Sequence, residues 1–76
     1  MQDKYYVKYR NFGLSVAYFR KMKGITQEEL SEAMGVHNET ISRIETANTG
    51  ISFDMLFSLA KALDMPASEL FAHAKL

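Results

Sequence analysis

Apolar residues recur along this chain at helical spacing, and no stretch shows the alternation of apolar and polar residues that marks a strand. Residues 12–23 place Phe12, Val16 and Phe19 on one helical stripe. Gly24 follows, at the place where a glycine in the left-handed conformation commonly ends a helix. The pattern therefore predicts a first helix over residues 12–23.

A second, short helix is predicted next, and it ends near Met34. Thr26 and Glu29 have the spacing of a capping box, in which each side chain accepts a hydrogen bond from the backbone N–H of the other residue. Gly35 then marks a tight turn. The residues of this helix that we expect to face inward are Leu30, Ala33 and Met34.

A third helix is predicted over residues 38–47, with Ile41 and Ile44 facing inward. Residues 48–51 are expected to form a loop. Two short helices joined by a glycine turn, each too small to stand alone, form a helix-turn-helix. The second and third helices are thus the candidate functional unit of the chain.

The last third of the chain predicts two more helices. Ser52 is a good N-cap for the fourth helix, and Asp54 lies in its positive first turn. Pro66 can open a short fifth helix that carries Leu70 and Phe71. The positions of the fourth helix that we expect to face inward are Phe53, Leu56, Phe57, Ala60 and Leu63.

The composition is that of one small globular domain. The 76 residues are 47% hydrophobic and include only four glycines and one proline. There is no cysteine, and His37 and His73 cannot build a metal site without carboxylates, so we expect no metal or other cofactor. No apolar run approaches the roughly 20 residues that span a bilayer. We therefore expect a cytoplasmic protein with no membrane partner.

The net charge is zero, but the charges are unevenly distributed. Residues 1–23 carry six basic residues and one acidic residue, whereas residues 24–76 carry three basic and eight acidic residues. A basic front on an acidic body favours an anionic partner that is met from one side. Short domains also show such a split by chance, so charge alone leaves both interpretations open.

From residue 12 to residue 71 the sequence resembles the lambda-repressor/Cro-like (XRE-type) family of helix-turn-helix DNA-binding domains. The resemblance covers 60 of the 76 residues, and it implies an all-α, compact five-helix domain. We accordingly divide the chain into an aromatic and basic arm or helix extension (1–11), the helix-turn-helix domain (12–72) and a C-terminal tail (73–76). The segments that carry the resemblance are RKMKGITQEEL (20–30), GV (35–36), TISRIE (40–45), SFDML (52–56) and LAKAL (59–63).

The face of the third helix opposite its apolar stripe is polar, and a helix has the width that fits the B-DNA major groove. Arg43 can hold guanine O6 and N7 with two donors, Asn38 can pair with adenine, and Glu39 can accept from cytosine N4. Ser42 can bond to either kind of base edge. These four residues are our candidates for reading bases.

Each of these residues also has a plainer interpretation. Asn38 is a good N-cap, and a capping side chain is not available to a base. Glu39 can be a solvated first-turn carboxylate, and Arg43 can pair with Glu39 one turn earlier. His37 is commonly a turn residue at a helix entrance, with a phosphate contact as its alternative role.

Backbone phosphates are expected to bind around the ends of the two helices. The resemblance implies that Gln27 holds a phosphate from the first turn of the second helix, where backbone amides point outward. Lys21 and Lys23 supply positive charge near the same edge. The other candidate phosphate-binding residues are Thr26, His37, Thr46, Asn48 and Thr49.

The resemblance also implies that Arg20 and Glu45 form a partly buried salt bridge that sets the third helix against the first.

Two features depart from the family. The loop after the third helix is often basic there, whereas residues 46–51 here carry no charge, and Asp64 stands where glycine is common. Fewer cations release fewer counterions, which predicts weak non-specific affinity for DNA and a shallow salt dependence.

Six of the nine aromatic residues lie before residue 20, more than one face of the first helix can bury. Either residues 1–11 fold back as an extra helical turn, or they form an interface. A homodimer would place two reading helices one DNA turn apart on a palindrome. Lys4, Lys8 and Arg10 can alternatively follow the phosphates.

The leading hypothesis is a sequence-specific transcriptional regulator of bacterial or phage origin. Its partner would be double-stranded DNA with a palindromic operator, bound by a homodimer on the nucleoid. The alternative is a protein-interaction module of the same fold, such as an antitoxin or a co-regulator. We do not expect an enzyme, because the sequence has no Ser/His/Asp set, no phosphate-binding glycine loop and no paired carboxylates on one face.

Overall fold

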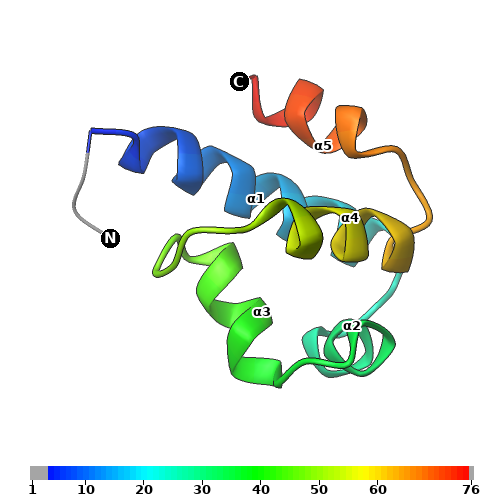
Figure 1. Ribbon diagram of the computed structural model, residues 1–76. Coiled ribbons are helices and arrows are strands. Elements are labelled where there is room, and N and C mark those ends of the chain that lie inside the picture. The colour runs from blue at the N-terminus through cyan, green and yellow to red at the C-terminus, as the bar shows by residue number, and fades with distance from the viewer. Residues whose placement is uncertain (1–3, 76) are drawn as a thin grey trace.

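The computed structural model describes residues 4–75, and within this range it contains helices and no strand (Figure 1). The prediction of an all-α, five-helix fold is confirmed. The helices are α1 (Tyr6–Met22), α2 (Gln27–Met34), α3 (Asn38–Glu45), α4 (Phe53–Ala62) and α5 (Ala67–Ala74).

The long helix α1 is the centre of the arrangement. It packs against α3 on one side and α5 on the other, while α4 bridges α2 and α5 (Figure 1). Ser15, fully buried on α1, donates a hydrogen bond of 2.9 Å to the carbonyl of Leu70 on α5. The core that these helices enclose consists of Phe12, Val16, Leu30, Ile41, Ile44, Leu56, Leu59, Ala60, Leu63 and Leu70.

The local signals at the helix ends are confirmed. Thr26 and Glu29 form the capping box, with Glu29 N to Thr26 Oγ1 at 3.0 Å and Thr26 N to Glu29 Oε1 at 2.9 Å. The Ser52 hydroxyl accepts from Met55 N at 3.1 Å. Gly35 adopts a left-handed φ of 70°, and Asp64 tolerates a left-handed φ of 54° where the family commonly has glycine.

Several boundaries differ from the prediction. Helix α1 begins at Tyr6 instead of residue 12, because no glycine or proline interrupts residues 4–12. Residues 6–11 are therefore the first turns of α1, which agrees with the helix extension that the sequence offered as one alternative, while residues 1–3 lie outside the described residues. Helix α3 ends at Glu45, two residues early, and α5 continues to Ala74, into the segment predicted to be a tail.

Three expected core positions are wrong. Ala33 is exposed, and the buried neighbour is Ser31, whose hydroxyl donates to Glu28 O at 2.7 Å. Phe53 and Phe57 are also exposed, at 75% and 61%. Helix α4 is apolar on more than one face, so periodicity did not distinguish the buried stripe. That stripe runs through Leu56, Leu59, Ala60 and Leu63.

Gly13 allows α1 and the end of α3 to approach closely. A Cβ atom at this position would lie 2.5 Å from the Ile44 carbonyl oxygen and 2.7 Å from that of Glu45. Both obstacles are backbone atoms, which cannot rotate away. A glycine is therefore required for the observed contact between the two helices.

We predict that Gly13→Ala lowers the free energy of unfolding by about 2–3 kcal/mol, because α3 must move away from α1 to admit the methyl group. Urea denaturation followed by circular dichroism measures this change. Leu14→Ala, at the neighbouring and exposed position of the same helix, is the control and should change stability by less than about 0.5 kcal/mol. Equal stability of the two variants would contradict the close approach.

Candidate nucleic-acid interface

Helix α3 has one apolar face and one polar face. Ile41 and Ile44 are buried in the core, at 0% and 4% exposure, as predicted. On the opposite face Asn38, Glu39, Arg43 and Thr46 are exposed and Ser42 is half-buried. The structure thus brings all four predicted base-reading residues to one accessible side of an eight-residue helix.

Asn38 does not cap α3. The N-cap is His37, which has an extended backbone and makes no side-chain capping bond, and Asn38 is the first residue of the helix. The capping interpretation of Asn38 is therefore wrong, because the helix begins one residue earlier than that role requires. The side chains of both residues are exposed at the start of α3.

Arg43 and Glu39 form an ion pair on the polar face of α3. Arg43 Nη2 lies 2.7 Å from Glu39 Oε1, one helical turn away, and the side chains are 59% and 70% exposed. Exposed pairs of this kind contribute about 0–1 kcal/mol, so Arg43 can leave Glu39 at little cost. With Thr40 and His37, this pair lines a shallow hollow of about 430 Å³. Thr40 is not one of the predicted site residues. It is half-buried and lies between the apolar face and the polar face of α3.

A second ion pair, between Arg20 of α1 and Glu45 of α3, fixes the end of α3 to α1. Arg20 Nε donates to Glu45 Oε2 at 2.6 Å and Nη2 donates to Oε1 at 3.2 Å, with only 10% and 6% of the side chains exposed. Arg20 Nη1 also donates to Ile25 O at 2.9 Å, in the turn between α1 and α2. Within residues 4–75 no buried side-chain polar atom lacks a hydrogen-bond partner. Charge burial at this point is therefore compensated.

Gln27 connects a third helix, α2, to the ion pair between α1 and α3. Its side-chain amide donates from Nε2 to Glu45 Oε1 at 2.9 Å, from the first position of α2. The sequence carries no signal of this bond, because residues 27 and 45 are far apart in the chain, and the resemblance implies only a phosphate contact for Gln27. A side-chain amide has two N–H donors, so one remains for a second acceptor.

The segment after α3 is organised by its own hydrogen bonds. The Thr46 hydroxyl donates to Ser42 O at 2.8 Å and accepts from Asn48 Nδ2 at 2.9 Å. The hydroxyl proton of Thr46 is thus used inside the chain, as threonine commonly does with the carbonyl four residues earlier. Asn48 keeps one amide proton and is exposed, whereas Thr49 is half-buried.

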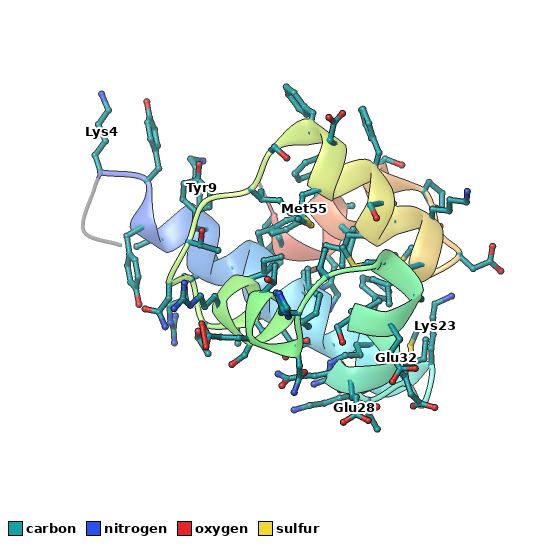
Figure 2. The ribbon with its side chains drawn as sticks, turned by 60° about the horizontal axis from the view of Figure 1, so that its bottom comes forward. Lys4, Tyr9, Lys23, Glu28, Glu32 and Met55 are labelled. Atoms are coloured by element: carbon teal, nitrogen blue, oxygen red, sulfur yellow. The ribbon has the colours of Figure 1, made fainter. Side chains whose placement is uncertain are left out.

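The lysines expected near this edge do not all face it. Lys23 Nζ lies 3.5 Å from the Asp64 carbonyl, in the turn between α4 and α5, although Lys21 is exposed at the end of α1. Figure 2 shows Lys4 just before α1 and Tyr9 in its first turns, and Tyr9 lines a hollow together with Ile51 of the segment that joins α3 to α4. Helix α3 itself contributes one basic residue, Arg43.

Two kinds of feature are absent from residues 4–75, namely a membrane-spanning helix and a cluster of metal ligands. None of the helices is both long and apolar enough to cross a membrane. Acidic and histidine side chains do not gather anywhere in this range in groups of three or more that can hold a metal ion.

Residues 16–70 match a family model described as Helix-turn-helix. The chain is also 34% identical over 65 residues to the competence pilus inhibition repressor of Acinetobacter baylyi, which covers 86% of this chain and 59% of that protein. It is 34% identical over 59 residues to the uncharacterized HTH-type transcriptional regulator YazB of Bacillus subtilis. This match covers 78% of this chain and 86% of that protein. The chain thus spans less than two thirds of the first relative.

Solved structures show the same architecture. The clp gene regulator ClgR of Corynebacterium glutamicum superposes with a TM-score of 0.86 at 28% identity, covering 90% of this chain and 88% of that one. The restriction-modification controller protein C.AhdI of Aeromonas hydrophila superposes with a TM-score of 0.85 at 30% identity, covering 87% of this chain and 100% of that one. The arrangement of α2 and α3 around α1 is therefore shared with known regulators.

We predict that Arg20→Ala lowers the free energy of unfolding by about 3–5 kcal/mol, because the carboxylate of Glu45 is left buried without its cation. Arg43→Ala removes the same kind of side chain from an exposed pair and should change stability by less than about 1 kcal/mol. Thermal and urea unfolding of both variants measure the difference. Equal melting temperatures would show that the Arg20–Glu45 pair does not support the fold.

Proposed function

This chain belongs to the Helix-turn-helix family, and on that premise we propose that it is a sequence-specific regulator of transcription that reads the major groove of double-stranded DNA with α3. The observation that carries the proposal is the exposed polar face of α3, which is backed by a buried apolar face and by the Arg20–Glu45 pair. A rigidly held helix can present the same donors and acceptors to each base sequence it meets.

The proposed base contacts follow from side-chain chemistry. Arg43 leaves Glu39 and donates two hydrogen bonds to guanine O6 and N7, while the released Glu39 carboxylate accepts from cytosine N4. Asn38, which is not occupied by capping, pairs with adenine N6 and N7. Ser42 is half-buried and reaches only a base edge that comes close to the helix axis.

The proposed phosphate contacts use neutral donors. Gln27 keeps one amide proton, and the backbone amides at the start of α2 attract an anion. The Thr26 hydroxyl accepts from Glu29 N and so retains its own proton. His37, Asn48 and Thr49 complete the set, whereas Thr46 contributes by holding Asn48 in place.

The charge of this surface limits affinity. Glu39 cancels Arg43 on α3, and the loop of residues 46–51 is uncharged, so few counterions are released when DNA is bound. A single copy would therefore bind weakly. We propose that two copies bind one palindromic operator. This doubles the number of base and phosphate contacts, while the net charge of the protein stays at zero.

A protein-interaction module of the same fold is the second candidate. It is favoured by the exposed apolar residues outside α3, among them Phe53 and Phe57. Such a module would use these side chains to cover another protein and would not need the polar face of α3.

The two candidates are separated by selecting DNA from a randomised duplex library at low salt and sequencing the bound fraction. Enrichment of a palindrome with half-sites about 10 base pairs apart supports a dimeric regulator. Enrichment of a single half-site supports DNA reading by one copy. An unenriched library would contradict the proposed regulator and favour the protein-interaction module.

We predict that Arg43→Ala weakens binding to the selected operator by about 10- to 100-fold and removes the preference at one base position, because a bidentate contact to guanine is lost. Fluorescence anisotropy with operator and with single-base variants measures both effects. Lys61→Ala, which removes one positive charge from the exposed side of α4, is the control and should leave the base preference intact. Unchanged selectivity of Arg43→Ala would overturn the role of α3.

A further inference from the structure

The solvent-facing side of α1 carries an apolar stripe. From Val7 to Tyr18 the stripe follows the 4-3-4 spacing of a coiled-coil seam, and Met22 extends it by one helical turn. Its large apolar side chains are exposed by between 48% and 64%. We refer to this stripe as the α1 seam, and its members are Val7, Asn11, Leu14, Tyr18 and Met22.

The end of α5 turns the α1 seam into one wall of a groove. A hollow of about 240 Å³ lies between the two helices. The ring of Tyr18 on α1 stacks on that of His73 on α5, with the centroids 4.3 Å apart and the planes inclined by 15°. A rod-shaped partner laid along α1 would therefore rest against both helices. The residues that line the hollow are Asn11, Leu14, Ser15, His73, Ala74 and Lys75.

The charges beside the α1 seam are basic. Helix α1 contains basic residues and no acidic residue. Lys8 and Arg10 flank the seam on its two sides, at the heptad positions e and g, whose side chains form ion pairs with a partner helix in a coiled coil. Both are exposed, and neither forms an ion pair with another of the residues that the structure describes. Lys75 adds a cation on the α5 side of the groove.

We propose that this groove binds an amphipathic helix of another protein, with apolar side chains toward the α1 seam and acidic side chains on both flanks. Binding of one helix in a groove uses apolar residues three and four positions apart, which is the spacing of the seam. Asn11 lies at heptad position a, where a single asparagine commonly fixes the register of two helices. The basic flanks then select a partner whose own flanks are acidic.

Two other occupants fit the groove less well. A second copy of this chain would bring the basic flanks of one α1 against those of the other, and like charges oppose such pairing. A lipid surface is bound by a broad apolar face. The α1 seam is one side chain wide at each turn and includes the polar amide of Asn11, so it suits a helix better than a lipid surface.

The groove lies away from the polar face of α3. Gly13 and Arg20, which contact the end of α3, are on the other side of α1 from the seam. Helix α3 packs on that side with Ile41 and Ile44 toward the core and its polar face outward (Figure 1). A partner in the groove therefore leaves the polar face of α3 accessible to DNA. This last step rests on the proposed function, whereas the binding of a helix does not.

A synthetic peptide of three heptads is the probe for the groove. It carries leucine at the a and d positions, with one asparagine at an a position, glutamate at e and g, and one tryptophan on its outer face. The chain itself has no tryptophan, so the anisotropy of the peptide's emission measures binding. Wild type should bind this peptide, and the same peptide with lysine in place of glutamate should bind at least about 10-fold more weakly.

Leu14→Gln tests the apolar part of the groove. It should raise the dissociation constant of the glutamate peptide by about 10-fold or more, because a leucine that the partner buries is lost from the middle of the α1 seam. Leu14 is 51% exposed and glutamine is a good helix former, so the variant should fold. Phe57→Gln, at an apolar residue of α4 with 61% exposure, is the matched control and should bind as wild type does. Equal binding by Leu14→Gln and wild type would overturn the groove.

Arg10→Glu tests the charge of the partner. It should weaken binding of the glutamate peptide and strengthen binding of the lysine peptide, whereas Lys61→Glu on α4 should change neither. An unchanged preference in Arg10→Glu would overturn the acidic partner. Wild type that binds neither peptide would overturn the proposal, and so would wild type that uses Leu14 only to bind phosphatidylglycerol vesicles or only to associate with itself.

Peptide binding in the presence of DNA distinguishes this inference from the proposed function. The glutamate peptide should leave the dissociation constant for the selected operator unchanged, and competition between the two would overturn simultaneous binding. Wild type that binds the peptide but selects no DNA would contradict the proposed function and leave the groove standing. Wild type that selects an operator but binds no peptide would do the reverse.

Discussion

The position of α3 depends on contacts that the helix cannot supply for itself. It has eight residues, too few to form a stable helix in water, so its place in the molecule is set by packing. Ile41 and Ile44 hold it to the core, but apolar contacts have little direction. The Arg20–Glu45 pair adds direction, because two hydrogen bonds fix the plane of the guanidinium against the carboxylate. The cost of removing both charges from water offsets much of the attraction within such a pair, so its main contribution is a well-defined geometry.

Glu45 is where the three helices of the interface meet. Its carboxylate accepts from Arg20 on α1 and from Gln27 on α2, while its own backbone carbonyl lies against Gly13. A displacement of any one helix therefore disturbs hydrogen bonds made by the other two. This arrangement explains how an 8.7 kDa protein without disulfides among its 76 residues can hold a short helix at a fixed angle.

The features that could be predicted from the sequence pattern itself are those that depend on nearby residues, whereas the Arg20–Glu45 pair, whose residues lie 25 positions apart, was expected only from the resemblance to a family. The capping box of Thr26 and Glu29 and the left-handed Gly35 involve residues within one turn, and α3 has one apolar stripe with a single interpretation. Other features depend on the whole fold. Phe53 and Phe57 resembled core residues because α4 is apolar on adjacent faces, and the packing of α4 against other helices, among them α2 and α5, determines which face is buried. The bond between Gln27 and Glu45 likewise has no local signal.

The neutral face of α3 limits the affinity that the proposed regulator can have for DNA. Non-specific attraction to DNA comes mainly from cations near phosphates, and the Glu39–Arg43 pair cancels the charge that α3 would otherwise bring. A protein of this kind gains little by sliding along unrelated DNA, and its binding energy must come from correct base contacts. The contacts of one short helix are few. Under the proposed function, selectivity therefore comes from the polar face of α3, and affinity comes from the binding of two copies to the two half-sites of one operator.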